Sequence, residues 1–115
     1  MRLNFKRIFF LLLIFSIPNC LYAGDLLLGK EKAAIVCAAC HGMDGQAASG
    51  GNSSLTPNIT AQEKEYLLAK LKDYKSGKIN HPQMSLIAQM LSDEDIENVS
   101  EWYSKIKISI ELPLE

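Results

Sequence analysis

Apolar residues recur at helical spacing in three stretches of this chain. The first begins at Asp25, a residue that suits the N-cap position, and runs into a pair of cysteines. The second covers about residues 62–76, and Gly77 stands where a glycine would end it. The third follows Ser92, another good N-cap, and continues to about Ile106. The pattern predicts a helical protein.

Two irregular segments separate these three stretches. Residues 42–60 are rich in Gly, Ser and Asn, and a second loop runs from Lys78 to about Met84. Irregular chain in this proportion usually wraps something in a small domain. We therefore expect an all-α fold in which three main helices and their loops surround a bound group.

The tail at residues 107–115 alternates apolar and polar residues. We expect a loosely attached terminus, because chain ends are poorly ordered unless something ties them down. A short extended segment and a docking segment for a partner are the two alternatives.

The first 23 residues have the pattern of a secretory signal. Basic residues precede an apolar run at residues 8–17, which is about half the length that a membrane-spanning helix needs. Cleavage after Ala23 would leave a domain at residues 24–106 followed by the tail. Lipid attachment at Cys20 and an uncleaved anchor are the alternatives. We expect a periplasmic protein with no stable membrane insertion once the signal is removed.

Removal of this signal would leave an acidic chain. The formal net charge of −1 for the 115 residues would become −4, because Arg2, Lys6 and Arg7 leave with the signal. An acidic chain without a basic stripe argues against nucleic acid as a partner. Such a short chain buries only a modest core, and a large apolar cofactor would stabilise it.

Cys37, Cys40 and His41 form the pattern C-x-x-C-H, which attaches haem. The two-residue spacer sets the reach of the two thiols to the vinyl groups on one edge of the porphyrin. His41 then lies under the ring, where its imidazole can ligate the iron. A zinc ribbon would need a second cysteine pair, and a thioredoxin-like pair would need a βαβ context. A structural disulfide stays as the alternative.

The iron needs a sixth ligand or keeps an open position. We predict Met84, because a loop can lay its thioether over the ring, and methionine with histidine raises the reduction potential as electron carriers require. Met90 falls just before the Ser92 cap, where we expect it to pack in the core. His81 precedes a proline and fits a surface position better than a bis-histidine site. An open position is the last alternative.

These residues resemble the class I c-type cytochromes, and above all their short bacterial periplasmic forms with one haem. The resemblance spans about residues 24–106. It rests mainly on C-x-x-C-H followed by Gly42, and on Met84 placed seven residues before the run L-S-D-E-D-I. The supporting matches are Gly24-Asp25, Gly29-Lys30, Asp44-Gly45, Pro57-x-Ile59-x-x-Gln62 and Tyr66-Leu67.

The resemblance implies roles for residues around the porphyrin. The backbone carbonyl of Pro57 would accept a hydrogen bond from the ring of His41 and orient the imidazole. The side chains of Ile59 and Leu67 would line the porphyrin. Together with Cys37, Cys40 and Met84, these residues make up the expected haem site.

The resemblance also implies a helix crossing, and the chain departs from the family at two positions. Gly29 would let the first helix cross closely against Trp102 or Tyr103 of the last. The family often has glycine where this chain has Ala61, so the turn there is expected to differ. It often has arginine in the second loop, where this chain has only Lys78. That difference leaves the partners of the haem carboxylates unassigned.

We therefore predict a periplasmic single-electron carrier with one covalently attached haem c, and not an enzyme. Its partners would be redox proteins that give and take electrons. Two alternatives come from other classes. One is an electron-entry subunit of a dehydrogenase or oxidase complex, for which the tail is the motive. The other is a haem enzyme or sensor whose iron keeps an open position.

Overall fold

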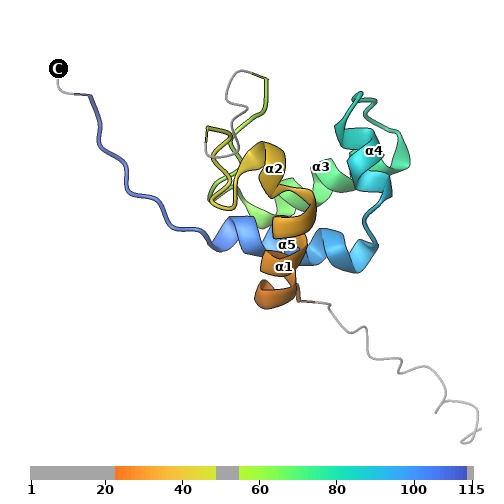
Figure 1. The fold of residues 1–115 in the computed structure, drawn as a ribbon, viewed down its shortest axis with the longest axis horizontal. Helices are drawn as coiled ribbons and strands as arrows, with labels where there is room; N and C mark the ends of the chain where they lie inside the picture. Colours follow the sequence, from red (N-terminus) through yellow and green to blue (C-terminus); the bar gives the residue numbers. More distant parts are fainter. Residues whose placement is uncertain (1–22, 49–54, 114–115) are drawn as a thin grey trace, which may run out of the picture.

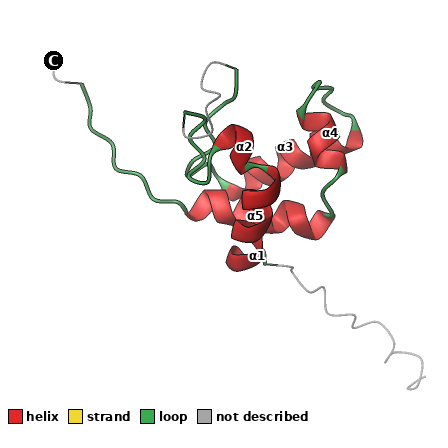
Figure 2. Ribbon diagram, viewed as in Figure 1, coloured by secondary structure: helices red, strands yellow, loops and turns green. Residues whose placement is uncertain are grey.

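The computed structural model describes residues 23–48 and 55–113, and these residues contain helices and no strand (Figure 1, Figure 2). The helices are α1 (Leu26–Val36), α2 (Ala38–His41), α3 (Lys64–Ser76), α4 (Met84–Gln89) and α5 (Asp93–Lys105). The predicted all-α fold is confirmed. None of the described helices is long and apolar enough to cross a membrane. Apart from Ala23, the predicted signal, with Cys20, lies outside the described residues.

Helix α1 begins at its predicted N-cap. The Asp25 carboxylate accepts hydrogen bonds from the backbone N–H groups of Leu27 and Leu28, at 2.8 and 2.9 Å. The Asp25 N–H donates to Oδ1 of Asn98 at 2.6 Å. One residue therefore caps α1 and ties its first turn to α5.

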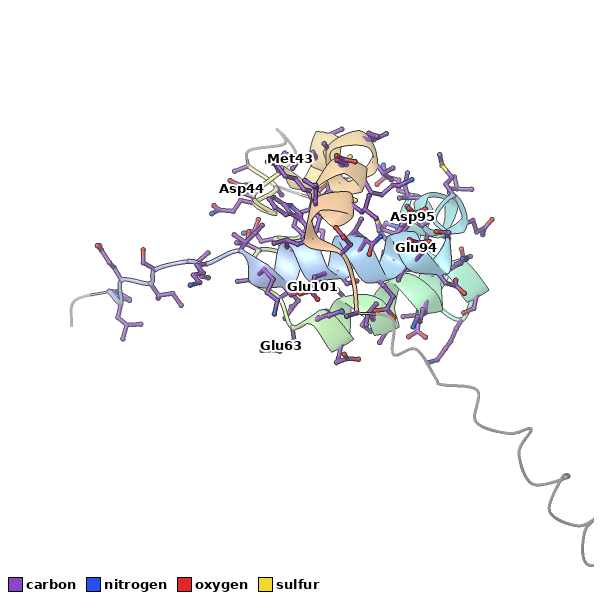
Figure 3. All side chains as sticks on the ribbon, turned by 90° about the horizontal axis from the view of Figure 1, so that it is seen from below. Met43, Asp44, Glu63, Glu94, Asp95 and Glu101 are labelled. Carbon is purple, nitrogen blue, oxygen red and sulfur yellow. The ribbon has the colours of Figure 1, made fainter. Side chains whose placement is uncertain are left out.

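Helix α1 crosses α5, as the views of Figure 1 and Figure 3 agree. The contacts at Gly29 place the crossing at this residue. A Cβ at position 29 would lie 2.0 Å from the backbone oxygen of Asn98 and 3.1 Å from Cβ of Trp102. Only a residue without a side chain allows this approach. The expected crossing is present, and Trp102 rather than Tyr103 is among the nearest residues of α5.

Helices α3 and α5 end and begin at predicted residues. Gly77 follows α3 with φ +78°, the left-handed conformation in which glycine commonly ends a helix. The Ser92 hydroxyl accepts from the Asp95 N–H at 3.0 Å, and the Asp95 carboxylate accepts from the Ser92 N–H at 2.9 Å. This reciprocal pair is a capping box, so the start of α5 is fixed by local chemistry.

Ion pairs fasten α5 to the helices beside it (Figure 3 labels Asp95 and Glu101). Lys32 of α1 lies 3.1 Å from Asp95, and Lys64 of α3 lies 2.9 Å from Glu101. Burial alone would raise the pKa of Asp95, but Ser92 and Lys32 outweigh it and lower that pKa. The hydrogen bond from Lys64 lowers the pKa of Glu101 and raises that of Lys64.

Replacing Glu101 by glutamine should make the fold less sensitive to acid. Because the folded pKa of Glu101 lies below its ordinary value, its ion pair stabilises the fold at neutral pH and is lost as the pH falls through that folded pKa. We expect E101Q to lower the free energy of unfolding by about 0.5–1 kcal/mol near neutral pH, and by less below about pH 4. Guanidinium unfolding across a pH series measures the difference.

Glu111→Gln is the matched control, because Glu111 is exposed on the tail. It should leave the free energy of unfolding unchanged at every pH. A stability loss in E101Q that stays constant down to acidic pH would contradict the role given to this ion pair.

Helix α4 was not predicted, and it corrects the position of Met84. The sequence placed Met84 in a loop, whereas Met84 is the first residue of this six-residue helix. The ring nitrogen Nδ1 of His81 accepts from the N–H groups of Gln83 and Met84, at 3.2 and 3.1 Å. The Ser85 hydroxyl accepts from the His81 N–H and donates to the Ile79 carbonyl. A histidine ring thus takes the place of the usual cap.

The prediction that Met90 packs in the core is wrong. Its side chain is 73 % exposed at the C-terminal end of α4. The buried positions near it belong to Leu91, Ile96 and Leu68, which pack together. Because α4 turns the chain before Ser92, Leu91 enters the core and Met90 faces solvent.

Beyond Lys105 the described chain has no regular structure and runs away from the helices (Figure 1). Ile108, Ile110 and Leu112 are exposed along it. The apolar alternation of this tail therefore finds no burial within the described part of the chain.

Candidate functional site

The cysteine motif forms the short helix α2 and the residue before it: Cys37 joins α1 to α2, and Cys40 and His41 are the last two residues of α2. The carbonyl of Cys37 accepts from the N–H groups of Cys40 and His41, at 3.2 and 2.9 Å. Cys37 is half-buried and Cys40 is exposed, and both are free thiols. The two hydrogen bonds therefore place the two thiols and the imidazole within one turn of helix.

The ring of His41 is held in a defined orientation. Only 8 % of the residue is exposed, and its Nδ1 lies 3.0 Å from the backbone oxygen of Pro57. A carbonyl oxygen only accepts, so Nδ1 carries the proton and donates. The lone pair then lies on Nε2, the nitrogen that can ligate a metal. The hydrogen bond expected from the resemblance is present.

The loop between α2 and α3 folds back on itself to deliver Pro57. The Ile59 N–H donates to the Gly45 carbonyl at 2.8 Å, and the Ala47 N–H donates to Asn58 Oδ1 at 2.9 Å. A Cβ at Gly45 would lie 2.7 Å from the backbone nitrogen of Thr60. Close backbone packing across the loop therefore sets the position of the Pro57 carbonyl.

Ala61 keeps the backbone conformation that glycine usually adopts. Its φ of +52° lies in the left-handed region, and its N–H donates to the Tyr103 carbonyl at 3.0 Å. This chain therefore adopts, with an alanine, a backbone conformation that favours glycine. The alanine side chain adds a cost of roughly 1–2 kcal/mol, which this hydrogen bond helps to offset.

Two aromatic residues of α5 hold the chain that follows the motif, a role that the sequence analysis did not assign to them. The Tyr103 hydroxyl donates to the Gly42 carbonyl at 3.0 Å, and Trp102 Nε1 donates to the Met43 carbonyl at 3.1 Å. Burial raises the pKa of Tyr103, so this hydroxyl stays protonated and donates. Buried Tyr and Trp usually find such partners, which is the signal that could have predicted these contacts.

Two adjoining cavities open beside the motif. The first has a volume of about 400 Å³ and the second about 320 Å³. Both are lined by Cys37, His41, Pro57, Tyr74 and Met84. Because these five residues belong to both walls, the two cavities adjoin each other, and together they are called the slot.

Every residue predicted for the haem site lines this slot. Ile59 and Leu67 line the first cavity and Cys40 the second, in addition to the residues that line both. The walls are mainly apolar, with Leu71 and Val99 beside Ile59 and Leu67. The fold therefore gathers in one place residues that lie far apart in the sequence.

The alternatives for the sixth ligand lie differently from Met84. Met90 lines neither cavity. His81 lines the second cavity, but its Nδ1 accepts two backbone N–H groups at the start of α4. The lone pair of a neutral His81 therefore accepts these backbone hydrogen bonds and is not available to the iron. Met84 is the remaining candidate, and it lines both cavities as His41 does.

The slot suits a flat apolar group with a polar edge better than it suits a metal ion alone. The hydroxyl of Ser100 is buried in the wall without a hydrogen-bond partner. Among the described residues, no group of three His, Cys, Asp or Glu side chains gathers to hold a metal. Burial raises the pKa of Cys37 to about 11, which differs from the lowered pKa of reactive redox thiols. These features fit a haem bound through both cysteines.

Comparison with known proteins gives a consistent result. The profile of the family described as Cytochrome c matches residues 27–107. Cytochrome c-554(548) of Halomonas halodenitrificans is 41 % identical over 85 residues, which cover 71 % of this chain and 96 % of the relative. Cytochrome c4 of Pseudomonas aeruginosa is 35 % identical over 88 residues, 76 % of this chain but only 41 % of that longer protein. The thiosulfate dehydrogenase electron acceptor of Stutzerimonas stutzeri is 38 % identical over 74 residues, 63 % of this chain and 32 % of that relative.

Proposed function

Since this chain belongs to the cytochrome c family and is an electron carrier with covalently bound haem c, we propose that its iron is held between His41 and Met84. The observation that carries this proposal is the position of the two side chains, which line both cavities from different helices. The bound haem supplies a ferrous–ferric couple that takes up and releases one electron. With both axial positions filled, little has to rearrange when the electron moves.

Cys37 and Cys40 hold the porphyrin by one edge. Each thiol adds across a vinyl group, so sulfur bonds to one carbon and the proton goes to the other. The helical turn that joins the two cysteines supports this role, because it presents both sulfurs to the same end of the slot. Covalent attachment keeps the cofactor from dissociating after export.

His41 and Pro57 act together on the iron side of the ring. The hydrogen bond from Nδ1 to the Pro57 carbonyl fixes the tautomer and the plane of the imidazole. A carbonyl at this nitrogen also makes Nε2 a stronger donor to the iron. The apolar side chains of Ile59 and Leu67 keep water from the ring, which favours the less charged ferrous state.

Met84 would supply the second iron ligand from the first residue of α4. The cap formed by His81 holds the backbone N–H of Met84, and the Ser85 hydroxyl anchors the same turn to the Ile79 carbonyl. These contacts fix the backbone from which the thioether extends. A ligand held in this way supports electron transfer with little reorganisation.

Met84→Ala should lower the midpoint potential and open the iron to added ligands. The ferric protein should lose its weak far-red sulfur-to-iron band and bind cyanide or imidazole rapidly, because the thioether is gone. Absorption spectra and a redox titration measure both effects. Met90→Ala is the control, since Met90 is 73 % exposed and lines neither cavity. A wild-type spectrum in the Met84 variant would refute the assignment.

The partners in this proposal are proteins that donate and accept single electrons, and the chain itself catalyses no reaction. The relative from Stutzerimonas stutzeri is named as the electron acceptor of a dehydrogenase, which supports an enzyme as one source of electrons. The exposed apolar tail favours a second candidate, a subunit held in such a complex. Deleting residues 107–115 should leave electron transfer from a soluble donor unchanged if the chain acts alone. Loss of a co-purifying complex on deletion would favour the subunit.

We further propose that the chain acts in the periplasm, with residues 1–23 as its signal, residues 24–106 as the cytochrome domain and residues 107–115 as the tail. Covalent haem supports this location, because exported proteins cannot rely on a pool of free cofactor. The N-terminal sequence of the purified holoprotein tests the boundary. Gly24 is the expected first residue, whereas a lipidated Cys20 or an intact Met1 would contradict it.

A further inference from the structure

We propose that Lys70 binds a carboxylate of the porphyrin, as the positively charged group at the end of the slot away from Cys40. The proposal rests on the haem function proposed above and assigns the polar edge of the same site. Lys70 belongs to α3, is half-buried and lines the first cavity.

The chemistry of the porphyrin sets where its carboxylates must go. The two vinyl groups lie on one edge of the macrocycle, and the two carboxylate side chains lie on the opposite edge. Cys40 lines only the second cavity. Thioether bonds to Cys37 and Cys40 therefore direct the carboxylate edge toward the first cavity, whose wall includes the polar side chains of Asn58, Gln62 and Lys70.

Among the described residues that line the two cavities, Lys70 is the one lysine or arginine. Its Nζ lies 5.5 Å from the centre of the Tyr66 ring, which also lines the first cavity. This cation–π contact holds the ammonium group beside the wall of the slot. A buried or half-buried carboxylate needs a charged or hydrogen-bonded partner, and a lysine at this position can supply both.

The other lysines of α3 are already paired with carboxylates of α5. Lys64 lies 2.9 Å from Glu101, Lys72 lies 3.5 Å from Glu97, and Lys75 lies 2.7 Å from Asp93. Among the described residues, Lys70 contacts no carboxylate, because it projects from a different face of the helix. The fold therefore leaves one α3 cation for a group inside the slot.

The second loop does not supply a competing cation. Lys78, the lysine of that loop, lies 3.0 Å from Asp73, its side chain is 73 % exposed, and it lines neither cavity. The position where related proteins often have arginine is thus turned away from the slot in this chain. Lys70 takes over the charge that the loop does not provide.

A cation at this carboxylate should affect the iron through electrostatics. The ammonium group offsets the negative charge near the ring and favours the ferrous state, because that state carries one positive charge fewer than the ferric state. It also keeps the carboxylate ionised over the range around neutrality. Without Lys70 the carboxylate would take up a proton at a higher pH, and the potential would then change with pH over that range.

The test is a redox titration of the holoprotein from mildly acidic to mildly alkaline pH, in four forms. Lys70→Met should shift the midpoint potential downward and make it fall as the pH rises, whereas Lys70→Arg should stay close to wild type at every pH. Lys78→Met removes the same charge from the surface and should give a smaller shift that does not depend on pH. Lys70→Gln replaces the methionine variant if that variant fails to fold.

Each outcome decides the proposal. A Lys70→Met profile that matches that of Lys78→Met would overturn it. The absorption spectrum of each form is recorded first, which separates this result from failure of the proposed function. Wild-type protein without covalent haem would contradict both the proposed haem function and the Lys70 proposal. Haem without methionine ligation would contradict only the Met84 assignment, and the Lys70 variants could still be compared.

Discussion

Protein in which Cys37 and Cys40 are both replaced by alanine should contain no haem after denaturation. The two thiols are the only atoms proposed to bond covalently to the porphyrin, because His41 and Met84 would ligate the iron and the other wall residues would only pack against the ring. We expect intact-mass spectrometry to show wild-type chain heavier by one haem and the double variant at its bare mass. The chain that loses this central apolar group should also unfold at a much lower temperature.

Cys20→Ala is the matched control for the cysteine variants, because Cys20 precedes the expected cleavage after Ala23. It should give the same holoprotein mass as wild type. The single variants separate the two bonds, since each should retain one thioether and a perturbed spectrum. Covalent haem in the double variant would contradict the proposed attachment.

Gly29→Ala should have the largest effect of any single substitution outside the slot. A Cβ there would lie 2.0 Å from the Asn98 oxygen and 2.7 Å from its carbonyl carbon, and both atoms belong to the backbone of α5. Backbone cannot rotate away as a side-chain tip can, so α1 and α5 would have to separate. We expect a loss of about 3 kcal/mol in the free energy of unfolding of the holoprotein.

Separation of these helices would also weaken the hydrogen bond from the Asp25 N–H to Asn98. Gly77→Ala is the comparison variant, because a Cβ at Gly77 would meet nothing within 4 Å and only its φ of +78° is unfavourable. That variant should lose about 1 kcal/mol. Guanidinium unfolding of both proteins gives the answer, and equal losses would contradict a steric role for Gly29.

Local chemistry explains which helix boundaries the sequence predicts. Asp25, Gly77 and Ser92 act on backbone groups within a few residues of themselves, so their identity and spacing are sufficient. Helix α4 could not be predicted in this way, because it is only six residues long. Its cap is the ring of His81, and histidine is not a usual capping residue. The wrong expectation for Met90 follows from the same missing helix.

The same distinction applies to the site: some of its residues could be predicted from the local sequence, and others could not. The cysteine motif carries its own chemistry, and the resemblance supplied Pro57, whose hydrogen bond to His41 spans 16 residues. The sequence did not predict some contacts between residues that lie far apart in the chain. The Tyr103 hydroxyl meets Gly42 across 61 residues, and the exclusion of Lys70 from the ion pairs of α3 depends on which helix face meets α5.

The most direct test of the covalent haem site is the absorption spectrum of the protein, expressed with its signal and a haem-attachment system and recorded first oxidised and then reduced. We expect sharp reduced bands of haem c that persist after denaturation and extraction of free haem. We also expect a weak far-red band in the oxidised form that disappears on reduction. Protein without haem, or with haem that is extracted, would contradict the covalent site at Cys37 and Cys40; bound haem without the far-red band would contradict Met84 as the iron ligand.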